Sequence, residues 1–201
     1  MEPRRSTRAM NNRYGNPAAL GFGAFAIGVW MNGMIDAGWF GVTMAGSNAF
    51  HTVLIFCTVA LFIAGIFEFL RARTWYAVFF MAFAALFWAY AHPLAATGAT
   101  PDDPTFGAWW WLGWALLAFY LWIAVLKAKA GTAVVLLSLG TWLVLLGNAV
   151  AGFTGAPIYM HIAGYIGLIT ALLSFYASAG AIINEMHGKI VLGGVGTNFQ
   201  N

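Results

Sequence analysis

The chain has 201 residues, of which 62% are hydrophobic and 7% charged, and its formal net charge is +3. So small a charged fraction leaves too little polar surface for a water-soluble domain of this size. The positive charge is confined to short segments between apolar runs, which indicates contact with anionic lipid headgroups and excludes nucleic acid as a partner.

Six apolar stretches each approach the length of about 20 residues that a helix needs to cross a bilayer. The sequence therefore predicts an all-α membrane protein, a six-transmembrane-helix bundle in residues 16-185, with a basic N-terminal segment at 1-15 and a C-terminal tail at 186-201. In chain order, the predicted spans are Ala18–Ile35, Ala49–Leu70, Trp75–Ala91, Ala108–Leu126, Thr132–Ala151 and Ile162–Ile183.

The nine Lys and Arg residues all lie before the first span or after the second, fourth and sixth spans. The other connections carry Asp36, Asp102 and Asp103, or no charge. Because basic segments close to span ends resist translocation, both termini are predicted to be cytoplasmic and the Asp102 loop to face outward. The predicted location is the cell membrane, either an inner or a plasma membrane.

Ionisable groups are almost absent from the predicted spans. Glu68 is the only acid within a span, and it precedes Arg71 by three residues, so it is interpreted either as half of an ion pair or as a group at a pore mouth. Without a Lys or Arg in mid-span, a translocated ion depends on neutral groups, helix N-termini or its own protonation. The neutral candidates, each equally able to link helices, are Asn16, Asn32, Ser138, Thr141, Asn148, Thr170 and Ser174.

Three histidines, His51, His92 and His161, stand at span ends on the predicted outer face. They are interpreted as a possible pH-sensing group, as metal ligands, or as unrelated residues that share one leaflet. Histidines at span ends fit haem ligation poorly, so no cofactor and no metal are predicted. The single cysteine, Cys57, excludes an intramolecular disulfide.

Several segments, in order along nearly the whole chain, resemble motifs of the acetate uptake transporter family, the succinate–acetate permeases. The stretch from Asn16 to Phe22 is similar to the family signature Asn-Pro-Ala-Pro-Leu-Gly-Leu, with Ala19 and Phe22 as departures. The further matches are Ala64–Phe69, Phe87-Trp88, Gly147-Asn148, His161–Leu168 and Ile183–Leu192.

The resemblance implies a six-helix protomer that assembles as a cyclic homohexamer, each protomer with its own path for acetate and related short carboxylates. The family path is narrowed by a Phe, a Tyr and a Leu, which correspond here to Phe25, to either Phe83 or Ala84, and to Leu137. The residues assigned to substrate binding or to a pore mouth are Asn16, Pro17, Leu20, Gly21, Glu68 and Asn148.

A physical argument supports the first of these positions. Pro at a helix start lacks an N–H that the helix does not need, and the adjacent Asn caps free backbone donors. The resulting helix N-terminus carries partial positive charge, which favours a carboxylate.

The sequence thus predicts a channel or proton-linked permease for acetate-like carboxylates, with protons as a possible co-substrate. Two alternatives remain: a pore for another small solute such as a neutral amide, and a non-transporting accessory subunit of a membrane complex. Enzymatic activity is not predicted, because no nucleophile–base pair lies where a substrate would reach it.

Overall fold

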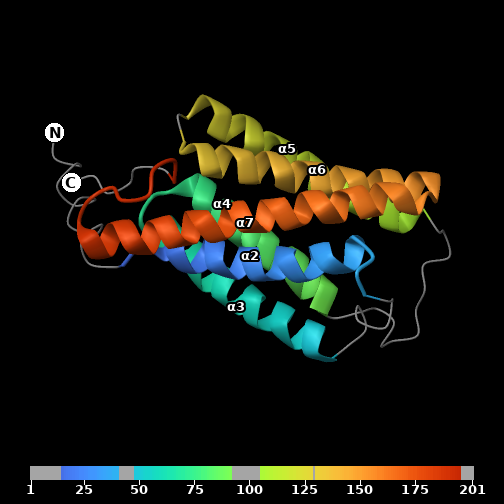
Figure 1. Ribbon diagram of the computed structural model, residues 1–201, viewed down its shortest axis with the longest axis horizontal. Helices are drawn as coiled ribbons and strands as arrows, with labels where there is room; N and C mark the ends of the chain where they lie inside the picture. The colour runs from blue at the N-terminus through green and yellow to red at the C-terminus, as the bar shows by residue number, and fades with distance from the viewer. Residues whose placement is uncertain (1–14, 41–47, 92–104, 129, 196–201) are drawn as a thin grey trace.

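The computed structural model describes residues 15–40, 48–91, 105–128 and 130–195, and within these ranges the chain forms six long helices (Figure 1). All six are long and apolar enough to cross a membrane, which confirms the predicted set of spans. Only α7 departs clearly from its predicted range, because it extends beyond Ile162–Ile183 at both ends. The helices are α2 (Pro17–Asp36), α3 (Asn48–Leu70), α4 (Thr74–Ala91), α5 (Phe106–Lys127), α6 (Thr132–Thr154) and α7 (Pro157–His187).

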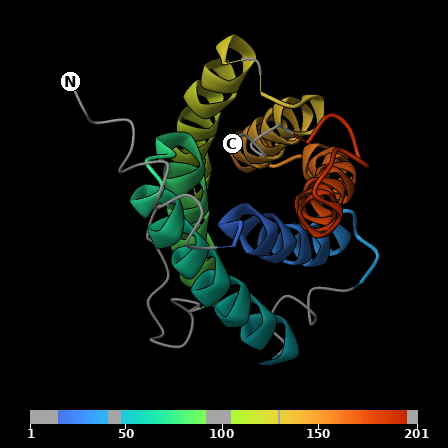
Figure 2. The same cartoon turned by 90° about the vertical axis from the view of Figure 1, so that its left-hand side faces the viewer.

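The helices form a ring in chain order. Each helix contacts the next one along the chain, and α7 returns to contact α2, which closes the ring. The view along the helices shows α2 between α3 and α7, with α5 and α6 on the opposite side (Figure 2). The ring encloses a central region that side chains from every described helix can reach.

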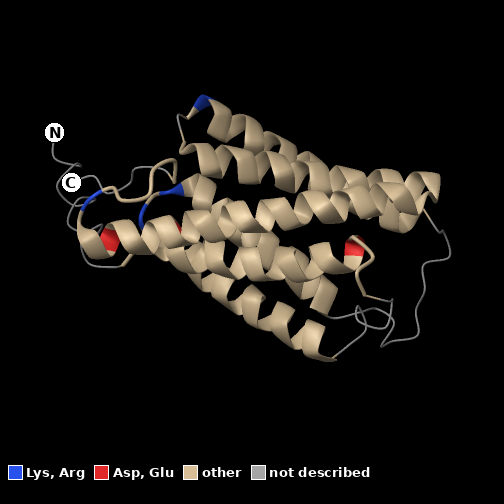
Figure 3. Cartoon of the chain, in the orientation of Figure 1, with Lys and Arg blue, Asp and Glu red and all other residues tan. Residues whose placement is uncertain are grey.

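The two ends of the bundle differ in charge. Every Lys and Arg of the described residues lies at the end where α2 begins and α7 finishes, which we call the basic end (Figure 3). At the opposite end, the far end, α2 stops at Asp36. This asymmetry within the described residues agrees with the distribution of basic residues in the sequence.

Helices α2 and α7 approach each other closely through small residues. A Cβ atom at Gly164 on α7 would overlap the backbone nitrogen of Ala37, just beyond the end of α2. Further along the same contact, the hydroxyl groups of Ser174 and Ser178 donate to the carbonyl oxygens of Phe22 and Ala19 at 2.9 and 2.7 Å. Small residues and interhelical hydrogen bonds are the usual means by which membrane helices pack.

Three of the hydroxyl groups predicted within the last two spans are satisfied inside their own helices. Ser138, Thr141 and Thr170 each donate a hydroxyl proton to the carbonyl oxygen four residues earlier, over distances of 2.7 to 2.8 Å. These hydroxyl groups therefore need no partner on another helix.

Candidate transport pathway

A cavity lies at the centre of the ring and is lined by residues from all six described helices. On α2 the lining residues recur every three or four positions from Phe25 to Asp36, and on α4 they do so from Phe83 to Tyr90. This spacing places them on one face of each helix. The cavity therefore extends from the middle of the bundle towards the far end.

Aromatic rings close the inner end of the cavity. The rings of Phe25 and Phe83 meet edge to face with their centroids 5.0 Å apart, and both side chains are almost completely buried. Phe79 packs against both rings, with centroid distances of 5.0 and 4.7 Å. An apolar closure of this kind presents a desolvation barrier to any ion.

The structure distinguishes between the candidates for the narrowest point. Phe25 and Phe83 line the cavity, whereas the alternative residue Ala84 is buried but is not part of the lining. Leu137 lies in the buried core one helical turn before the lining residue Thr141. Two of the three predicted residues thus line the cavity, and the third, Leu137, is buried in the core without being part of the lining.

The far end of the cavity carries a buried carboxylate. The Asp36 residue is only 8% exposed, and its Oδ2 accepts hydrogen bonds from Nδ2 of Asn32 at 3.1 Å and from Nδ2 of Asn148 at 3.2 Å. The sequence had suggested that Asp36 belongs to a connection outside the membrane. Instead α2 remains helical through Asp36, and its position four residues after Asn32 puts both side chains on the same face.

Asn148 therefore lies away from the other residues assigned to a pore mouth. Its side chain donates to Asp36 at the far end and also to the carbonyl oxygen of Val144. Asn16, Pro17, Leu20 and Glu68 lie towards the basic end, where α2 begins and α3 finishes.

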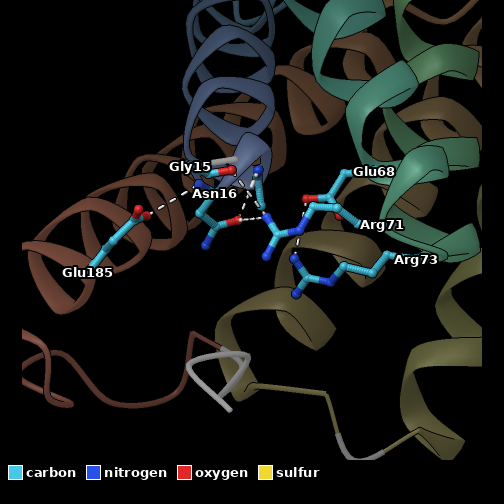
Figure 4. Close-up of polar contacts among 7 residues, drawn as sticks. Gly15, Asn16, Glu68, Arg71, Arg73 and Glu185 are labelled. Carbon is cyan, nitrogen blue, oxygen red and sulfur yellow. Dashed lines mark hydrogen bonds and ion pairs between the residues drawn. The ribbon is translucent and has the colours of Figure 1, made fainter. Parts of the chain in front are cut away.

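A hollow at the basic end is lined by Asn16, Pro17 and Leu20 together with residues of α3. The amide donors at the start of α2 are largely used within the protein. Asn16 Oδ1 accepts from the N–H of Ala18 at 3.2 Å, and the N–H of Asn16 donates to Glu185 Oε2 at 3.3 Å (Figure 4). The Arg71 side chain reaches the same place, where Nη1 donates to the carbonyl oxygen of Gly15 at 3.4 Å.

Glu68 is fully buried beneath these groups, and its Oε1 forms an ion pair with Nη1 of Arg73 at 3.3 Å (Figure 4). Glu68 thus forms an ion pair with Arg73, and its charge also acts on Arg71, the partner suggested by the sequence. Ala72, with a φ angle of 57°, turns the chain sharply between the two arginines. Burial lowers the pKa of the Arg71 guanidinium and the charge of Glu68 opposes this effect, but arginine stays protonated at physiological pH.

Gly21 has a packing role rather than a place in either cavity wall. A Cβ atom on Gly21 would lie only 2.5 Å from the ring of Phe80, so the absence of a side chain lets α4 approach α2. Gly21 is among the lining residues of neither the central cavity nor the hollow.

Two of the three candidate histidines lie at the far end. His51 stands in the first turn of α3 and His161 near the start of α7, and both are half-buried. The ring of His161 lies beside Gly38, two residues after Asp36. His92 lies outside the described residues, and among the described residues no three His, Cys, Asp or Glu side chains are grouped as metal ligands would be.

A ring of membrane-length helices around a central cavity defines a multi-span membrane protein with an internal cavity, an arrangement typical of channels and transporters. The chain belongs to the GPR1/FUN34/yaaH family, whose model matches residues 1–192. This is the acetate uptake transporter family, whose members are channels and transporters rather than enzymes.

Individual relatives match about nine tenths of the chain. An uncharacterised protein of Methanothermobacter thermautotrophicus is 26% identical over 193 residues, which cover 91% of this chain and 92% of that protein. The succinate-acetate/proton symporter SatP of Escherichia coli K12 is 25% identical over 190 residues, which cover 90% and 96% of the two chains. A solved structure of the bacterial acetate channel SatP has the same fold, with a TM-score of 0.81, 20% identity, and coverage of 90% of this chain and 98% of that one.

Proposed function

We propose that this protein carries acetate or a closely related short monocarboxylate across the membrane together with a proton. The observation that carries the proposal is the central cavity, which passes between all six helices and ends at the Phe25–Phe83 pair. Relatives of this chain that are named for succinate, acetate and proton transport support the same class of substrate.

The composition of the cavity wall favours a neutral form of the substrate at the narrow point. Among the described residues that line the cavity there is no Lys and no Arg, so no fixed cation balances a carboxylate. A carboxyl group with a pKa near the glutamate value of about 4.3 is mostly ionised at neutral pH. Protonation removes the largest part of its desolvation penalty before it passes the aromatic rings.

The proposed orientation places the basic end in the cytoplasm and the far end outside, since basic residues collect at cytoplasmic span ends. A carboxylate arriving from outside then meets the polar end of the cavity first and the aromatic rings second. At the basic end, substrate leaves past the hollow beside Asn16, Pro17 and Leu20.

We further propose a homohexamer, by resemblance to the family. Each protomer has its own path, because residues from the helices of one chain line the whole described cavity. Native mass spectrometry of the solubilised protein tests this number of subunits.

Uptake of labelled acetate, propionate, succinate and urea into liposomes that contain the purified protein tests the proposed function. The expected result is uptake of acetate and propionate above that of protein-free liposomes, with little urea. Faster uptake of urea than of acetate would instead support a pore for a neutral amide. No uptake of any of the four solutes would support an accessory subunit.

A further inference from the structure

The hydrogen bonds of the Asp36 carboxylate, at the far end of the cavity, suit a ligand that can donate a hydrogen bond. Asp36 lies on the cavity wall and is only 8% exposed, and its two amide contacts, from Asn32 and Asn148, both fall on Oδ2. No other hydrogen bond from the described residues reaches this carboxylate. Its Oδ1 is therefore available to a donor that enters the cavity.

We propose that Asp36, Asn32 and Asn148 form a binding site for a small carboxyl group in which the ligand and Asp36 share one proton. This inference rests on the proposed function and assigns the site that couples the proton to the carboxylate. The ligand O–H donates to Asp36 Oδ1, and the ligand carbonyl oxygen accepts from an asparagine amide.

The physical reason is the repulsion between two carboxylates in a cavity of low polarity. Two such groups cannot both stay ionised at close range, so they hold a proton between them. The remaining lining is dominated by apolar and aromatic side chains, including Leu54 and Trp111, which provide no compensating positive charge. The site therefore excludes an acetate anion that brings no proton, whereas it binds acetate when one proton is shared between acetate and Asp36.

The proton balance closes over one transport event. A proton enters with the carboxylate from the far end, lies between the ligand and Asp36 while the ligand is bound, and departs on the ligand towards the aromatic rings. Asp36 returns to its starting state, and the net transfer is one carboxylate and one proton with no net charge.

The position of Asp36 is fixed by the backbone around it. Gly164 allows α7 to contact the backbone of Asp36 and Ala37 directly, and Asn148 holds the carboxylate from the opposite side of the cavity. The Asp36 backbone thus packs against α7, and its carboxylate is held by hydrogen bonds from α2 and α6, as a binding group requires.

The other titratable groups near the site are few. Tyr90 on α4 lines the same cavity, and His161 on α7 lies beside Gly38. His51 lies in the first turn of α3 at the same end of the bundle. The lining residues from α5 and α6 include no group that titrates near neutral pH. Asp36 is the only carboxylate among the described residues that line the cavity.

The test compares the wild-type protein with Asp36→Asn in liposomes whose membrane potential is set with a potassium gradient. Labelled acetate uptake is measured from pH 5.5 to 7.5, roughly the range over which the acid fraction falls about tenfold per pH unit. For the wild-type protein, the acetate concentration that gives half-maximal uptake is expected to rise as this acid fraction falls, and uptake should not respond to the imposed potential. In Asp36→Asn, three amides can donate to the bound anion without a shared proton, so the acetate concentration that gives half-maximal uptake should change less than about twofold per pH unit. The aromatic rings still exclude the anion, so uptake by the variant should also not respond to the potential.

The matched control is Asp103→Asn, which removes a carboxylate from the connection between α4 and α5 and should behave as wild type. If Asp36→Asn does not fold, Asp36→Ser removes the same carboxylate with a smaller polar group. The inference would be overturned by a folded Asp36 variant in which the acetate concentration for half-maximal uptake keeps the wild-type dependence on pH. A folded variant that moves no acetate at any pH or potential would also contradict it. Absence of acetate uptake by the wild-type protein would reject the proposed function itself.

Discussion

Asn148 on α6 and Asp36 at the end of α2 are 112 residues apart in sequence, yet the Asn148 amide donates to the Asp36 carboxylate at 3.2 Å. This hydrogen bond crosses the far end of the central cavity. It connects α6 with α2, and it holds a polar group at the far end of the cavity.

This hydrogen bond should contribute measurably to stability. Asn148→Ala leaves the buried carboxylate of Asp36 with one donor fewer, which should cost about 1–3 kcal/mol. The control is Ser138→Ala on the same helix, because the Ser138 hydroxyl bonds only to the Val134 carbonyl oxygen of its own helix. Thermal unfolding in detergent should show a clearly lower midpoint for Asn148→Ala than for Ser138→Ala. Equal midpoints would show that the bond between α6 and α2 contributes little.

The α2–α7 contact provides a second test of the packing. Gly164→Ala places a methyl group on the backbone of Ala37 and should destabilise the protein by about 1–3 kcal/mol or more. At Gly167, on the same helix, an added Cβ would find its nearest neighbour 3.6 Å away, an ordinary contact. Gly167→Ala should therefore unfold close to the wild-type temperature. The account of this contact fails if the two alanine variants are equally stable.

The apolar closure at the inner end of the cavity can be tested by shortening its buried side chains, with the neighbouring exposed Leu136 as the control. Phe25→Ala and Leu137→Ala remove buried apolar bulk at the inner end, so they should widen the path and admit larger carboxylates relative to acetate. Leu136→Ala changes the adjacent residue, which is 43% exposed on the outside of the bundle, and should leave selectivity unchanged. Flux assays with acetate, propionate and butyrate measure the effect. Unchanged flux and selectivity in both folded variants would show that neither residue lines the narrow point.

The proposed orientation is tested by labelling single cysteines in intact cells. In a Cys57→Ala background, a cysteine at position 102 should react with an impermeant reagent from outside, and one at position 129 should not. The reason is the location of the basic residues at cytoplasmic span ends. Labelling of position 129 from outside would reverse the orientation.

Much of the fold follows from the sequence alone, because a bilayer requires apolar stretches of nearly fixed length. All six spans are therefore recognisable without knowledge of their contacts. The end of α2 is harder to predict, since Asp36 is a charged residue next to Ala37 and Gly38 and resembles the start of a loop. The spacing between Asn32 and Asp36 is the local signal for its true environment.

The candidate site was only partly predictable, because some of its contacts depend on how the helices are arranged and not on local sequence. Motif positions identify Phe25, but they leave Phe83 and Ala84 as alternatives, and only the structure shows that Phe83 lines the cavity. The separation of Asn148 from Asn16 and Glu68 depends instead on how the helices are arranged around the ring. Likewise, the sequence places Arg71 nearest to Glu68, whereas the turn at Ala72 brings Arg73 within 3.3 Å of it.

Proton-linked movement of acetate is the central claim, and its most direct test is the pH dependence of uptake. Labelled acetate uptake into liposomes is measured at several external pH values for the wild-type protein and for a variant with His51, His92 and His161 all changed to Ala. Protein-free liposomes provide the background. Both proteins should take up acetate faster as the external pH falls, because the proton moves with the carboxylate and does not act through the histidines. Uptake that depends only on membrane potential and acetate concentration, and stays flat with pH in both proteins, would contradict the account.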